Sequence, residues 1–267
     1  RLTELWDDAR AVKESLHSRT VRYTKPLPTP FNYDFKATFK TGSPFSNPDM
    51  NTLFGNAELL YGIFCSRSPR ICSNGEGFWD VFGNTNLNDT PGFENAVLLG
   101  LHTSGSRKIH ISPRATRDFD VLAHEMGHEY AQQMLGDTTN KGEVGAVNEA
   151  YGDIAAFLAG GNRTVFNNVQ GQNPQSLENP SARMGNYSPV CSNVHLNARI
   201  LDRAFILARD ATSFEVMQET FRRAMAGGFI QPASGFRGFR GGIVASSGSA
   251  SGAPPRRRSS RRSTRSV

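Results

Sequence analysis

Cysteine is scarce in this chain of 267 residues, which has only three, and long apolar runs are missing. Three cysteines are too few for a disulfide scaffold. Either Cys65 and Cys72 close a short loop and leave Cys191 unpaired, or all three are reduced thiols. No run approaches the roughly 20 apolar residues that a bilayer-spanning helix needs, so we predict no membrane span. The chain starts at Arg1 without a signal-like segment, and we expect a processed or truncated product.

Acidic residues are missing after Glu219, whereas eight arginines lie from Arg237 to Arg265. These arginines account for the net charge of +6, because the rest of the chain has 22 basic and 24 acidic residues. We therefore predict no specific nucleic-acid partner for the folded part. The basic tail could bind polyanions, but a passive extension is the favoured interpretation.

Local patterns divide the chain into three parts. Residues 1–117 mix strand-like and helical segments; we expect helices at 1–19 and 50–64 and strands at 31–39, 96–101 and 108–112. Residues 118–230 are mainly helical; we expect helices at 118–135, 144–159, 195–209 and 213–226, with a loop-rich stretch at 160–194. Gly, Ser, Pro and Arg dominate residues 231–267, which have no apolar periodicity and are predicted to be disordered.

The segment His124-Glu125-Met126-Gly127-His128 has a spacing typical of metal sites. By chance, a chain of this composition would contain an H-E-x-x-H roughly 0.006 times, so a random origin is a poor explanation. On a helix, residues four apart share a face, which lets both imidazoles reach one ion. Glu125 then lies beside the ion without binding it, where a base for an activated water belongs.

Two histidines cannot hold a catalytic zinc alone, and the next helix offers a third ligand. Glu149 follows His128 by 21 residues, and a tight turn would place the two helices side by side. Asp153 lies one turn beyond Glu149, placed to accept the free N–H of a ligating histidine. The alternative, a solvated acidic edge, fits poorly with a segment otherwise rich in Ala, Val, Ile and Gly.

H-E-x-x-H followed about 20 residues later by G-A-x-N-E-A-x-x-D, here Gly145 to Asp153, resembles the thermolysin family of secreted zinc metalloendopeptidases. The resemblance implies three zinc ligands, a base and two hydrogen-bond partners of the histidines. These are His124, His128 and Glu149 as ligands, Glu125 as the base, and Asp153 and Asn148 as the partners.

Two further segments carry the resemblance. FENAVLLG resembles the family's N-A-F/Y-W-x-G strand, which implies that Asn95 and Ala96 bind the substrate backbone. NVHLNARILDRAFIL resembles V-H-x-N-S-G-I-x-N-x-A-F, in which the histidine, here His195, stabilises the oxyanion. An ordinary polar residue at a helix start is the alternative interpretation of His195.

The chain departs from the family pattern at four places. The tyrosine expected before E-x-G-A falls near Asn140, and the aspartate that pairs with the downstream histidine falls near Val190. For the expected arginine, Arg183 is the nearest candidate, although Glu178 could align there instead. Of the calcium-binding acidic cluster only Asp120 is kept, so structural calcium is left open.

The resemblance implies an α+β fold with two lobes, a β-rich N-terminal one and a mostly helical C-terminal one, with the zinc helix as the floor of the cleft. It implies a secreted, monomeric zinc metalloendopeptidase that acts on proteins or peptides. Three alternatives stay open: a zinc aminopeptidase, a degenerate binding protein that keeps its metal, and an effector that cleaves one host protein.

Overall fold

The structure is a computed structural model of the chain. It describes the following residues: 2–7, 12–15, 20–26, 33–40, 48–67, 79–83, 100–103, 108–135, 141–167, 174–179, 183–188, 194–231 and 233–250.

Seven strands form one sheet in the order β4-β3-β2-β1-β5-β7-β6. They are β1 (Leu2–Asp7), β2 (Val12–Ser15), β3 (Thr20–Pro26), β4 (Tyr33–Lys40), β5 (Trp79–Gly83), β6 (Gly100–Thr103) and β7 (Lys108–Ile111). Most neighbouring strands are antiparallel, but β5 runs parallel to both β1 and β7. The strands predicted at 31–39 and 108–112 are confirmed as β4 and β7. The strand predicted at 96–101 meets β6 only at its last two residues, and 96–99 lie outside the described residues.

The helix predicted at 1–19 is wrong, because this segment contributes β1 and β2 to the sheet. Its apolar residues recur at helical spacing, and that local pattern is the basis of the prediction. However, β1 hydrogen-bonds to β2 on one side and to β5, more than 70 residues away, on the other. Such distant pairing satisfies the backbone on both edges and can override a local preference.

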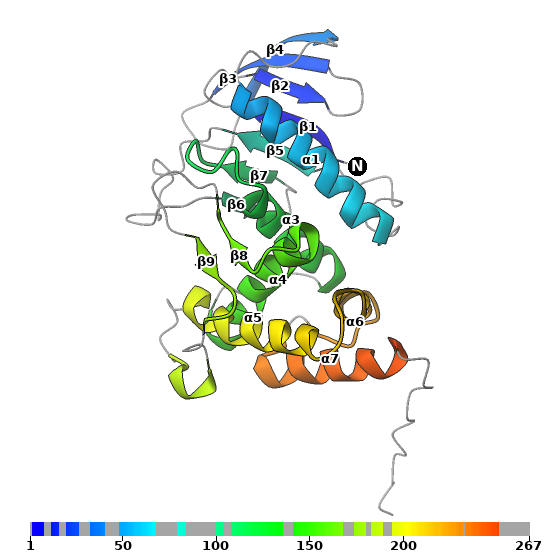
Figure 1. Cartoon of the computed structure of the whole chain (residues 1–267). Coiled ribbons are helices and arrows are strands. Elements are labelled where there is room, and N and C mark those ends of the chain that lie inside the picture. The colour runs from blue at the N-terminus through cyan, green and yellow to red at the C-terminus, as the bar shows by residue number, and fades with distance from the viewer. Residues whose placement is uncertain are drawn as a thin grey trace, which may run out of the picture.

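Helix α1 (Pro48–Arg67) confirms and extends the helix predicted at 50–64. It packs against β1 and against the first of the later helices, and Figure 1 shows it crossing the sheet. Its apolar side chains Met50, Leu53 and Leu60 are fully buried. The approach to β5 is close, since a Cβ added at Gly83 would lie 2.5 Å from the Met50 sulfur.

The four helices predicted between residues 118 and 230 are confirmed. They are α3 (Phe119–Leu135), α4 (Gly142–Gly160), α5 (Val194–Asp210) and α6 (Phe214–Ala226). The Asp118 side chain accepts a hydrogen bond from the Val121 N–H and caps α3, and Ser213 caps α6 in the same way. Gly161 ends α4 in the left-handed conformation.

Helix α4 is the centre of the helical part. It is buried from Gly145 to Leu158, with α3 packed on one side and α5 on the other. In the loop-rich stretch that follows it, two short strands pair, β8 (Thr164–Val165) and β9 (Gln175–Ser176), and a 3-10 turn covers Met184–Asn186. Because α4 packs against both α3 and α5, a residue on α4 can contact side chains from several elements.

The prediction of a disordered tail is wrong for residues 236–250, which form helix α7 (Phe236–Ala250). Phe236 and Phe239 are buried, and the Phe239 ring lies 5.8 Å from that of Tyr151 on α4. The backbone N–H of Phe236 donates to the Glu143 carboxylate, at 3.1 Å. The two buried phenylalanines and the Glu143 contact stabilise α7. Its sequence is rich in Gly and Ser, so its few apolar residues did not predict a helix. Residues 251–267 lie outside the described residues.

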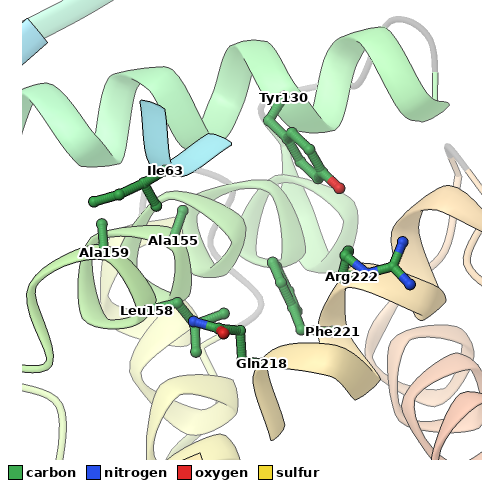
Figure 2. Close-up of a pocket in the computed structure, with 8 residues that line it drawn as sticks. All are labelled: Ile63, Tyr130, Ala155, Leu158, Ala159, Gln218, Phe221 and Arg222. Atoms are coloured by element: carbon green, nitrogen blue, oxygen red, sulfur yellow. The ribbon is translucent and has the colours of Figure 1, made fainter. Parts of the chain in front are cut away.

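A small apolar cavity lies where α1, α3, α4 and α6 meet (Figure 2). Its lining consists of Ile63, Tyr130, Ala155, Leu158, Ala159, Gln218, Phe221 and Arg222. None of these residues belongs to the predicted metal site. No helix in the described part of the chain has the length and apolar character to cross a membrane.

Candidate metal centre

The two histidines of the HEMGH segment lie on one face of α3. Their Nε2 atoms are 2.9 Å apart, and their rings meet edge to face with centroids 4.5 Å apart. This contact follows directly from their spacing, because residues four apart on a helix lie one above the other. Both side chains are at least nine-tenths buried.

Glu149 on α4 completes a group of three. Its Oε2 lies 3.5 Å from Nε2 of His124 and 3.6 Å from Nε2 of His128. Zinc binds N and O ligands at about 2.0–2.1 Å, and a tetrahedron of that radius has edges of about 3.3–3.4 Å. The three separations scatter around that edge length. His124, His128 and Glu149 therefore form a buried group that could hold a metal ion.

The charges of this group also favour a cation. Burial alone would lower the pKa of His124, but hydrogen bonds to Asp153 and Glu149 raise it well above its usual range. Burial alone would raise the pKa of Glu149, but the charge of His128 and contacts with the histidines hold it well below. The buried carboxylates thus require positive charge, which either a proton on His124 or a metal dication supplies.

Asp153 lies where the sequence places it, one turn beyond Glu149. Its Oδ1 lies 2.9 Å from Nδ1 of His124, so Nδ1–H donates to the carboxylate and Nε2 is the ring nitrogen that faces His128 and Glu149. Asn148 is buried on α4 next to Glu149. Its predicted hydrogen bond to a ligating histidine stays a prediction.

Two glycines allow α3 and α4 to approach at the site. A Cβ added at Gly152 would lie 2.6 Å from two atoms of the His124 ring, and one at Gly127 would lie 2.6 Å from the Ala155 Cβ. Real Cβ atoms essentially never come so close. Gly127 stands inside the HEMGH segment and Gly152 beside Asp153, and the sequence reasoning assigned a role to neither.

Glu125, the predicted base, is buried on α3 next to His124. Burial raises its pKa, while the charges of His124 and His128 oppose that shift. A carboxylate whose pKa is raised toward neutrality is better matched to accepting and returning a proton. The position and environment of Glu125 thus fit the role that the spacing implied.

His195 stands on the open side of the group, in the first turn of α5. Its Nδ1 lies 3.0 Å from Oε2 of Glu149, although 70% of its side chain is exposed. The hydrogen bond with Glu149 raises the pKa of His195. Nearby, Asn197 exchanges two hydrogen bonds with the backbone of Ser188, which ties the preceding loop to α5. His195 therefore lies next to a candidate metal ligand and is also accessible from solvent.

Several predicted positions fall outside the described residues: Asn95, Ala96, Asn140 and Val190. Arg183 is exposed at the start of the 3-10 turn. Glu178 forms an ion pair with Arg163, which also pairs with Asp210 at the end of α5. Arg163 thus links Glu178, next to β9, to the last residue of α5 through two exposed ion pairs.

The β8–β9 hairpin makes contacts with the site that the sequence reasoning missed. The Phe166 ring, on a residue with φ of 63°, lies 5.7 Å from the His124 ring. The Gln175 amide lies 3.4 Å from Oδ2 of Asp153. Neither residue belongs to a spacing pattern, so no local signal points to them.

Asp120, the residue kept from the calcium cluster, accepts a hydrogen bond from the Asn167 amide at 3.0 Å. Burial, and to a lesser degree the charge of Asp118, raise the pKa of Asp120 from 3.8 to about 6. The folded chain therefore binds this proton more tightly than the unfolded chain. The stability that the proton contributes is full below about pH 4 and is lost as the pH rises through about 6.

We expect Asp120→Asn to stabilise the metal-free protein at pH 7.5 by about 1–2 kcal/mol and to leave it nearly unchanged at pH 4. The amide cannot ionise, and its oxygen can still accept from Asn167. Urea unfolding at both pH values, with a chelator present, measures the difference. Calcium that stabilised the native chain but not the variant would contradict this account and place an ion at Asp120.

No protein-family model matches the sequence, and no curated protein matches it. Among solved structures, the chain is similar to the precursor of protealysin, a metalloproteinase from Serratia proteamaculans. The TM-score is 0.69 at 15% sequence identity, and the match covers 93% of this chain and 82% of the other. At that identity the likeness shows the fold alone. The chain has the fold of a metalloproteinase precursor, in agreement with the thermolysin-like α+β fold that the sequence predicts.

Proposed function

We propose that this protein is a zinc-dependent metalloendopeptidase. One observation carries the proposal: two imidazoles and a carboxylate meet in a buried group, with Asp153 fixing one imidazole, on the fold of a metalloproteinase. The donor set of two His and one Glu is typical of catalytic zinc sites, which leave one position open for water. The division into two lobes, the secreted state and the monomeric state are proposals that follow from the family resemblance.

Zinc bound to His124, His128 and Glu149 would supply a Lewis acid that lowers the pKa of water and polarises the scissile carbonyl. Glu125 would take the proton from the attacking water and return it to the leaving amine. His195, on the open side, would donate to the oxygen that becomes negative in the tetrahedral intermediate. Asn95 and Ala96 are proposed to hold the peptide as an added strand.

Metal removal gives the direct test. We expect the native chain to bind one zinc ion and to cleave casein at internal bonds. A chelator should abolish the cleavage, and added zinc, but not calcium, should restore it. Zinc content by elemental analysis, together with mass spectrometry of the products, measures both results. A sample dialysed without chelator is the control.

Each alternative has its own outcome in this experiment. Release of single N-terminal residues alone would favour the aminopeptidase. Bound zinc without hydrolysis of any peptide would favour the binding protein, whereas cleavage restricted to one protein would favour the effector. A chain that binds no zinc at micromolar concentration would sink the proposal itself.

A further inference from the structure

Asp153 has two carboxylate oxygens in different surroundings. Oδ1 accepts from the His124 ring at 2.9 Å, and Oδ2 faces the Gln175 side chain at 3.4 Å. Gln175 belongs to β9, whereas Asp153 belongs to α4, so the contact joins the hairpin to the site. A carboxylate held at one oxygen can turn about its bond to Cβ, and a second contact restricts that turn.

Arg199 fixes the direction of the Gln175 amide. Its Nη2 lies 3.0 Å from Oε1 of Gln175. A guanidinium can only donate, so the amide oxygen must face Arg199 and the amide N–H₂ must face Asp153. The chain of contacts therefore has one direction: Arg199 donates to Gln175, Gln175 donates to Asp153, and Asp153 accepts from His124.

A second buried carboxyl, Asp202, faces Asp153 from the next turn of α5. It is 1% exposed, and burial together with the charge of Asp153 raises its pKa well above its usual range. These surroundings favour the neutral form of Asp202, which adds no negative charge next to Asp153. Asp153 can therefore accept hydrogen bonds although α5, with a second carboxyl, packs against it.

Arg199 and Asp202 differ from the family segment that α5 resembles. In V-H-x-N-S-G-I-x-N-x-A-F, the position of Arg199 holds glycine and that of Asp202 holds asparagine. Glycine could make no contact with Gln175. The contacts around Asp153 are thus a property of this chain and do not follow from the motif.

We propose that Gln175 and Arg199 are positioning residues of the metal site, which hold Asp153 so that it aligns the His124 ring toward the ion. This inference rests on the metal site of the proposed function. A free ring would have to be ordered when the ion binds, whereas a ring already held loses less entropy. β9 and α5 would thereby tune the metal affinity through residues that are not among the three candidate ligands.

The experiment is a double-mutant cycle on zinc affinity, measured by competition with a chelator. Removing a residue that hydrogen-bonds to a metal-binding histidine typically weakens metal affinity about 10–100-fold. For Gln175, which contacts such a partner and not the histidine itself, we expect a loss of zinc affinity of about 3–10-fold. Gln175→Met should weaken zinc binding by that factor in the native chain but not in an Asp153→Ala background. Arg199→Ala should act like Gln175→Met, and Arg199→Lys should restore most of the affinity.

A control in the same hairpin separates positioning from general loosening. Ser176→Ala removes the hydroxyl that accepts from the Glu178 N–H but leaves the contacts of Asp153 intact. It should leave zinc affinity unchanged. The melting temperatures of the metal-free variants show whether each one folds. If Asp153→Ala does not fold, a cycle of Gln175→Met, Arg199→Ala and the double variant replaces it. The double variant should then lose no more zinc affinity than either single variant.

Equal zinc affinity of native protein and Gln175→Met would overturn the inference and leave the proposed function standing. The inference also fails, again without affecting the proposed function, if Gln175→Met weakens binding equally with and without Asp153. A native chain without zinc affinity would overturn both. Because affinity is measured without any substrate, loss of peptide hydrolysis alone does not affect the result.

Discussion

Replacing Glu125 with glutamine is expected to lower kcat/KM for peptide hydrolysis by about 10²–10⁴-fold, the usual contribution of a general acid–base group. Zinc should stay bound at one ion per chain, because Glu125 is not one of the three residues that meet as ligands. The amide has nearly the shape of the carboxylate but cannot accept a proton. Initial rates on a quenched fluorescent peptide, together with zinc content, measure the two effects separately.

Glu129→Gln is the matched control for this variant. Glu129 is also buried on α3, one turn after Glu125, and the variant makes the same replacement of a carboxyl by an amide. We expect its kcat/KM to stay close to that of the native chain once the folded fraction is accounted for. Full activity of Glu125→Gln, or equal losses in both variants, would contradict the role of Glu125 as the base.

The second large effect is expected from Gly152→Ala, which should weaken zinc binding by more than about 100-fold. This loss exceeds the effect of removing a residue that hydrogen-bonds to a metal-binding histidine. The added methyl would lie 2.6 Å from Cε1 and Nδ1 of His124, so the ring must move or α4 must shift. Either movement breaks the contact between His124 and Asp153. Overpacking of this kind also costs about 1–3 kcal/mol of stability.

Gly55→Ala serves as the control. Gly55 lies in α1, is exposed, and an added Cβ there meets nothing within 4 Å. The same substitution should raise stability by up to about 1 kcal/mol, because alanine favours the helix, and should not change zinc affinity. Chelator competition and urea unfolding of both variants provide the comparison. Native zinc affinity in Gly152→Ala would show that α3 and α4 separate without cost.

Two errors of the sequence reasoning have a common origin. The apolar spacing in residues 1–19 predicts a helix, but pairing with the distant β5 makes strands there. The Gly- and Ser-rich composition of residues 236–250 predicts disorder, but the segment forms a helix because Phe236 and Phe239 pack into the core and Glu143 caps its start. In both segments the deciding contacts come from residues far away in the chain.

The candidate metal ligands on α3 could be predicted from the sequence because their geometry is local. A helix of 3.6 residues per turn places His124 above His128 whatever surrounds it, and the Nε2 separation of 2.9 Å reflects this. Glu149 required one further assumption, a tight turn between the two helices, and the apolar residues around Glu149 and Asp153 supported a buried carboxylate with a cation as its partner.

What surrounds these ligands depended on tertiary packing. Gly127 and Gly152 matter only because α3 and α4 cross there, and Gln175 and Arg199 matter only because a hairpin and a helix meet at Asp153. No residue spacing encodes such contacts, since they arise from the shapes of side chains brought together from distant parts of the chain. The local sequence thus specifies which side chains of α3 share one face, and the packing of distant elements decides how firmly they are held.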